Sequence, residues 1–126
     1  MTLELTLLTW SVALAVIQML IAFGTAMLEF GLPDIAGNRE PPAASLAGRA
    51  QRASQNMLES LVLFAVLVFV AEIMNRTNAS TGLGAEVFFA ARVVYSMVSL
   101  AGLPWLRTGV WCVSIAALLL IFVQLL

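Results

Sequence analysis

Histidine and lysine are absent from this 126-residue chain, and it contains a single cysteine, Cys112. A zinc site built from histidine and cysteine is therefore excluded, as is a nucleophile activated by a neighbouring histidine. The carboxylates are scattered over different segments, so we expect no metal ligands of that kind either. One cysteine cannot form an internal disulfide, and Cys112 is interpreted as a packing residue inside an apolar stretch.

Charge is also scarce. Charged residues make up 10% of the chain and apolar residues 62%, whereas soluble domains have about 25% and 45–50% respectively. Six arginines against seven acidic residues give a net charge of -1, which provides no field to attract nucleic acid. The composition is that of a membrane protein.

Four apolar segments are each long enough to cross a bilayer, which takes about 20 residues in a helix. The first has no basic region before it and no small-residue cleavage signal after it, so we expect it to remain as a helix. Together the segments predict an all-α, integral membrane four-helix bundle that forms one domain over residues 1–126. The expected spans are residues 5–30, 50–73, 85–103 and 105–126.

The connections between the spans differ in character. The segment from Gly31 to Ala47 is rich in proline and glycine and is predicted to be the longest loop. Pro104 suits the first turn of the last helix, so the third and fourth spans are predicted to form a tight hairpin. Arginines concentrate in the first loop and near Pro104, which predicts that both termini face away from the cytoplasm.

Polar residues recur at helical spacing on the second and third spans. Arg52, Asn56 and Glu59 stand at i, i+4 and i+7 and so share one side of a helix. Arg92 and Tyr95 begin a second stripe that continues to Ser99. The two stripes predict one shared polar site.

The predicted position of these charged residues within the membrane favours a polar binding site. A charged side chain at mid-helix costs about 2.5–3.5 kcal/mol on insertion scales, so it is expected to face protein or a water-filled cavity. The alternative is that Arg52, Arg92 and Glu59 form ion pairs that hold helices together. Arg49 and Arg107, nearer the ends of their spans, could instead extend their head groups into water. Gln18 in the first span is a candidate buried hydrogen-bonding partner.

The chemistry of the stripes indicates the type of ligand. Guanidinium groups bind carboxylates through paired hydrogen bonds and stabilise other anions. We therefore expect a small, polar, anionic molecule that enters from the cytoplasmic side.

The stripes also carry a family resemblance. The segments Arg52-Ala-Ser-Gln-Asn56-Met-Leu-Glu59 and Arg92-Val-Val-Tyr95, followed by Arg107, resemble the MAPEG family, the membrane-associated proteins of eicosanoid and glutathione metabolism, which include the microsomal glutathione transferases. The resemblance covers most of the chain. It implies a homotrimer in which glutathione, as co-substrate, binds between neighbouring subunits.

The same resemblance implies a role for each residue. The ligand-binding set for glutathione would be Arg52, Asn56, Glu59, Arg92 and Tyr95. Arg107 would be the catalytic residue, lying near the sulfur and favouring the thiolate, which attacks a lipophilic small-molecule substrate from the bilayer.

Two departures from the family pattern keep other functions open. Ser99 stands where many members have a second tyrosine, and the end of the first span lacks their basic residues. A non-catalytic lipid-binding or scaffold protein on the same fold is one alternative. A small transporter is another, for which an essential intramembrane carboxylate would be expected.

Overall fold

Each of the four predicted spans corresponds to a helix in the computed structural model, which describes residues 2–31 and 45–126. They are α1 (Leu3–Phe30), α3 (Leu46–Ile73), α4 (Ala79–Ala101) and α5 (Pro104–Leu125). Each is long and apolar enough to cross a membrane. Most of the predicted first loop, residues 32–44, lies outside the described residues.

Local capping explains where the helices begin. Ser45 accepts a hydrogen bond from the backbone of Gly48, so α3 starts at Leu46. Asn78 and Thr81 form a reciprocal capping box, and α4 therefore starts at Ala79 rather than near residue 85. Residues 79–84, expected in the loop, are the first turns of this helix. Pro104 occupies the first turn of α5, as predicted.

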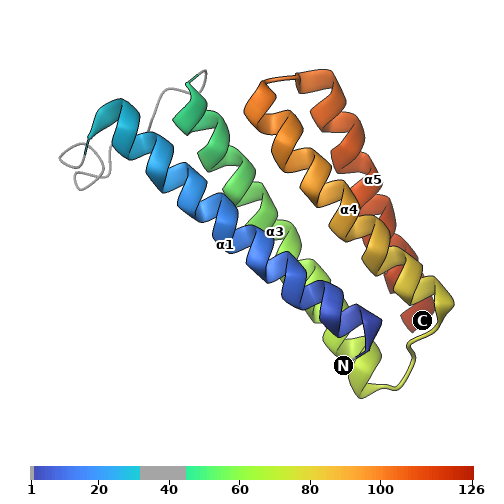
Figure 1. The fold of residues 1–126 in the computed structure, drawn as a ribbon. Helices are drawn as coiled ribbons and strands as arrows, with labels where there is room; N and C mark the ends of the chain where they lie inside the picture. The colour runs from blue at the N-terminus through green and yellow to red at the C-terminus, as the bar shows by residue number, and fades with distance from the viewer. Residues whose placement is uncertain (1, 32–44) are drawn as a thin grey trace.

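The helices pack as two pairs, α1 with α3 and α4 with α5 (Figure 1). Only Gly102 and Leu103 separate α4 from α5, which confirms the predicted hairpin. Gly102 has φ +77°, a left-handed conformation that ends α4 at little steric cost. Both chain ends lie at the opposite end of the bundle from this hairpin (Figure 1).

The core lies between the helix pairs, and the outside is apolar. Phe64 of α3 stacks on Phe88 of α4 with ring centroids 4.3 Å apart, and both side chains are fully buried. Large apolar side chains such as Leu20, Val62 and Leu119 are exposed on the outer faces. An apolar exterior of this kind is stable in lipid, so the chain is an integral, multi-pass membrane protein.

Gly84 allows α4 and α5 to pack closely. A Cβ at this position would lie 2.7 Å from Cγ1 of Ile121 and 3.0 Å from the carbonyl oxygen of Ala117. Gly84→Ala is therefore expected to lower the free energy of unfolding by about 1–3 kcal/mol, because the backbone of α5 must move. Thermal unfolding in detergent, followed by circular dichroism, measures the effect. Gly24→Ala is the matched control because no atom lies within 4 Å of its added Cβ. Equal stability of the two variants would contradict the prediction.

A buried carboxylate lies at the end of the bundle that holds the termini. Glu4 of α1 is 5% exposed, and its Oε1 accepts a 2.8 Å hydrogen bond from the hydroxyl of Thr81. Nearby, the hydroxyl of Thr2 donates to the carboxylate of Glu72. These bonds join α1 to α4 and to the end of α3.

Thr81→Val preserves the shape of the side chain and removes both the bond to Glu4 and half of the capping box. We expect a loss of about 1–3 kcal/mol in the free energy of unfolding, because a buried carboxylate loses its donor. Thr9→Val is the control, since the exposed Thr9 bonds only to the backbone of its own helix. Detergent unfolding of both variants measures the difference. A loss at Thr81 no larger than at Thr9 would show that the contact contributes little.

Candidate functional site

Arg92 is the most completely buried charged residue described, with 0% exposure in the middle of the bundle. Its Nη2 donates a 2.8 Å hydrogen bond to Oδ1 of Asn56 on α3. Its Cζ lies 4.2 Å from the ring centroid of Tyr95, one turn further along α4, a cation–π contact. The bond and the stacked ring fix the guanidinium plane between α3 and α4.

The other two nitrogens of this guanidinium are not satisfied by the described residues. Nε and Nη1 of Arg92 are buried and have no hydrogen-bond partner among the described residues. Buried polar atoms without partners are uncommon, and they occur where a ligand or a functional constraint supplies the reason. Among the described residues, Arg92 is therefore not part of a saturated structural ion pair.

A cavity of about 300 Å³ opens in front of Asn56 and Tyr95. We call it the arginine cavity. It lies between the start of α3, the end of α4 and the start of α5, at the hairpin end of the bundle. The lining residues are Arg52, Asn56, Tyr95, Arg107, Thr108 and Trp111.

The structure brings four of the six predicted site residues to this cavity: Arg52, Asn56, Tyr95 and Arg107. Arg92 lies behind them, in contact with Asn56 and Tyr95. Two arginines at the cavity and a third behind it make a strongly positive region, while no carboxylate is among the lining residues. Such a region is suited to an anion.

Glu59, the remaining predicted residue, is exposed and does not line the arginine cavity. It shares a face with Arg52, as its spacing predicts, but seven residues of helix place it about 10 Å further along the axis. Helical phase alone therefore does not bring it to the same pocket. Ser99, the end of the second stripe, is buried, and its hydroxyl has no hydrogen-bond partner in the described part of the chain. It too lies outside the lining.

Arg49 makes a contact that its sequence position does not predict. Its Nε donates to the carbonyl oxygen of Leu100, at 3.3 Å, in the last turn of α4. A cation next to these carbonyls also interacts favourably with the negative end of the helix dipole. Arg49 thus ties the start of α3 to the end of α4, beside the arginine cavity.

Thr108 and Trp111 were missed by the sequence analysis. Both lie on α5, and Trp111 follows Arg107 by four residues, so the two share one helix face. The spacing of four residues from Arg107 is the signal in the sequence that identifies Trp111. Its ring gives the cavity a large apolar wall beside the guanidinium groups.

Comparison with known proteins identifies the family of this chain. No curated protein and no solved structure gave a match. The family model for the MAPEG family matches residues 7–126, nearly the whole chain, and so includes every residue of the arginine cavity. The chain therefore belongs to the MAPEG family of membrane proteins of eicosanoid and glutathione metabolism.

Proposed function

We propose that this protein binds glutathione in the arginine cavity and activates its thiol toward lipophilic electrophiles. The observation that carries the proposal is the buried guanidinium of Arg92. It is oriented by Asn56 and Tyr95 and has two unpartnered donors behind a cavity that also holds Arg52 and Arg107.

The charge of the site matches this ligand. Glutathione is a tripeptide with two carboxylates, one amine and one thiol, so it carries a net negative charge. Guanidinium groups bind carboxylates through two parallel hydrogen bonds, which fixes orientation as well as adding affinity. A cavity of about 300 Å³ is at the lower end of the range for small-molecule sites. In this proposal Arg52 holds one carboxylate at the cavity. The site opens between Asn56 and Tyr95 so that Arg92, which lies behind them, holds the other.

Arg107 has the catalytic role in the proposal. A free thiol has a pKa of about 8.5, and a neighbouring cation lowers it. Lowering it by about two pH units requires roughly 3 kcal/mol of preferential interaction with the thiolate. The thiolate then forms a carbon–sulfur bond with the electrophile, which releases its leaving group with the bonding electron pair. The apolar exterior of the bundle gives such lipophilic molecules access from the bilayer.

Two exposed carboxylates support assembly into an oligomer. Glu59 on α3 and Glu86 on α4 are both exposed in the single chain although they lie within membrane-spanning helices. A carboxylate facing lipid is costly, so these positions are expected to face protein or water. We propose that neighbouring subunits cover them in a homotrimer, and that Glu59 then contributes to glutathione binding from the interface.

The orientation of the site follows the arginine distribution. The arginine cavity lies at the hairpin end, and the termini lie at the other end (Figure 1). Because most arginines are near the first loop and the hairpin, we propose that this end faces the cytoplasm.

Titration of the purified, detergent-solubilised protein with glutathione tests the proposal. Calorimetry is expected to give saturable binding, and the ultraviolet absorbance of the thiolate is expected to rise in proportion to bound ligand. S-methylglutathione, which cannot form a thiolate, is the control: it should bind without the absorbance change. Absence of binding would reject the glutathione site, and binding without a thiolate would reject the nucleophilic mechanism.

A lipid-binding protein without catalytic activity is the second candidate. It is favoured by an apolar groove of about 300 Å³ between α3 and α5, whose walls include Leu63, Leu67, Leu118 and Phe122. A lipid that co-purifies with the protein, is retained in Arg52→Ala and is unaffected by glutathione would support it. Recovery of lipid-free protein with glutathione-dependent activity would reject it.

A further inference from the structure

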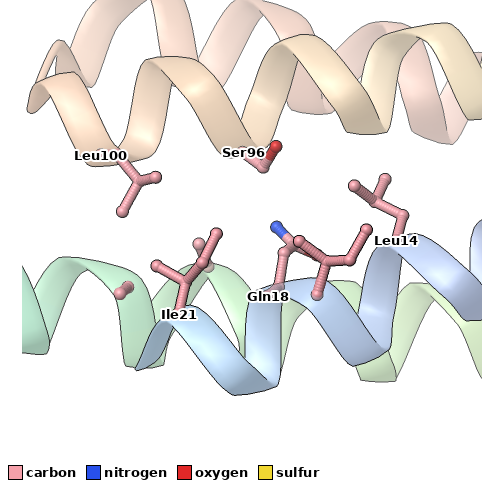
Figure 2. A pocket seen from close by; sticks show the side chains of 8 residues that line it. Leu14, Gln18, Ile21, Ser96 and Leu100 are labelled. Atoms are coloured by element: carbon pink, nitrogen blue, oxygen red, sulfur yellow. The ribbon is translucent and has the colours of Figure 1, made fainter. Parts of the chain in front are cut away.

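A second, smaller cavity lies inside the bundle, between α1, α3 and α4. Its volume is about 50 Å³. Most of its wall is aliphatic, with Leu14 and Ile21 of α1, Ala50 of α3 and Leu100 of α4 among the lining residues (Figure 2). No charged residue and no residue of the arginine cavity contributes to the lining. It is therefore a separate site.

Gln18 is the polar group of this cavity. Its side chain is 5% exposed, and neither its amide nitrogen nor its amide oxygen has a hydrogen-bond partner among the described residues. Figure 2 shows the amide directed across the cavity toward α4, where Ser96 lies. The hydroxyl of Ser96 donates to the backbone carbonyl of Val93 at 2.8 Å, which leaves its oxygen able to accept. The sequence predicted a buried hydrogen-bonding residue at Gln18, and a partner for it is still required.

An amide of this kind is costly to bury unless a hydrogen bond compensates, and the cost is greater in a low-dielectric environment. A single hydroxyl group could donate to the amide oxygen and accept from the amide nitrogen. A water molecule also fits the volume and could bond to the Gln18 amide and to Ser96, but it would leave the aliphatic part of the wall without carbon contacts. The aliphatic wall is suited to contact with a hydrocarbon chain.

The size of the cavity limits the guest further. A volume of about 50 Å³ exceeds the 10–15 Å³ or so that one water needs, and it is well below the roughly 150 Å³ of a cavity that holds benzene. A slender chain fits better than a ring. Ile17 and Ile21 line the cavity and are also exposed on the outer surface of α1, so its wall extends to the outside of the single chain.

We propose that this cavity binds the hydroxyl end of an uncharged straight-chain alcohol from the bilayer, with Gln18 as the hydrogen-bonding anchor. The hydroxyl bonds to the amide, the first carbons contact the aliphatic wall, and the rest of the chain leaves past Ile17 and Ile21 toward lipid. The site is independent of glutathione, because it shares no residue with the arginine cavity.

Photolabelling of the full-length protein in lipid nanodiscs tests this proposal. The probe is octanol that carries a diazirine in its chain, and the matched control probe is the corresponding diazirine-bearing octane without the hydroxyl. Peptide mass spectrometry is expected to place the octanol label on residues of α1 and α4 that line the cavity. Excess unlabelled octanol should remove this label, and octane should not.

Three variants make the result specific. Gln18→Leu preserves size and removes the hydrogen bond, so we expect cavity labelling by the alcohol to fall about five- to tenfold. Ser96→Leu fills the cavity from the α4 side while Gln18 stays in place, and it should reduce labelling in the same way. Gln55→Leu changes an exposed glutamine on α3 and should have no effect. Equal labelling by the alkane, retention of the label in both cavity variants, or absence of any saturable label at the cavity would overturn the proposal.

Discussion

Arg107→Gln is expected to reduce the amount of bound glutathione thiolate at pH 7 about 25-fold, while glutathione still binds. If Arg107 lowers the thiol pKa from about 8.5 to about 6.5, most of the bound thiol is ionised at pH 7 in the wild type. Without the guanidinium the pKa returns toward 8.5, and only a few per cent is ionised. The pH at which half of the thiolate absorbance appears should therefore rise by about two units.

Turnover is expected to fall less than the thiolate signal. A more basic thiolate is intrinsically more reactive, and this partly offsets its lower abundance. The absorbance titration is therefore the sharper measurement, with the pH profile of turnover as support. Arg107→Lys preserves the charge and should retain part of the effect. Arg76→Gln is the matched control, because Arg76 lies at the opposite end of the bundle and bonds to the carbonyls of Leu125 and Leu126. An unchanged thiolate titration in Arg107→Gln would assign the activation to another group.

The fold was predictable from the sequence because the bilayer imposes a simple length rule on apolar segments. The four helices and the α4–α5 hairpin follow directly from that rule and from Pro104. Helix beginnings were predicted less well. The start of α4 at Ala79 depends on the capping box between Asn78 and Thr81, a local hydrogen-bond pattern that hydropathy does not detect. The composition of these polar residues alone predicts a loop.

The site was predictable in part, and for a different reason. Helical phase correctly placed Arg52 and Asn56 on one face, and tertiary packing brings that face against Tyr95. Helical phase says which residues share a face, but it does not say how far a cavity extends along the helix axis. Glu59 therefore shares the face of Arg52 and still lies outside the cavity. Helical phase also does not show which helix packs against which, so the carbonyl that Arg49 contacts on α4 could not be anticipated.

The partners of buried polar residues on different helices could not be predicted from the sequence. In the sequence Glu4 is one charged residue near the start of the chain, and nothing there indicates its hydrogen bond with Thr81. Gln18 is an isolated polar residue in an apolar helix, and the sequence can say that it needs a partner without saying which one. Only the arrangement of α1, α3 and α4 shows that it points into a cavity.

Arg92→Met is expected to weaken glutathione binding about 10- to 100-fold with little or no loss of stability of the protein. Hydrogen bonds to a charged group contribute about 1.5–3 kcal/mol each, and a factor of ten in affinity corresponds to about 1.4 kcal/mol. Methionine fills a similar slender volume but has no donors. Calorimetric titration of the variant with glutathione measures the loss of affinity.

The stability of this variant separates the two interpretations of the buried arginine. If Arg92 mainly held α3 and α4 together, its removal would lower the free energy of unfolding by several kcal/mol, as the loss of one member of a buried pair does. Its Nε and Nη1 have no partners among the described residues. Burying this cation therefore costs desolvation energy that the bond to Asn56 and the contact with the Tyr95 ring only partly offset.

We therefore expect the free energy of unfolding of Arg92→Met to lie within about 1 kcal/mol of wild type, or to increase. Detergent unfolding with and without glutathione measures both the free energy of unfolding and the binding of glutathione. The second follows because a ligand stabilises only a protein that binds it. Arg76→Met is the matched control and should retain the stabilisation by glutathione. Lower stability of Arg92→Met together with undiminished binding would make Arg92 a structural residue, and the ligand's carboxylates would then depend on Arg52 and Arg107.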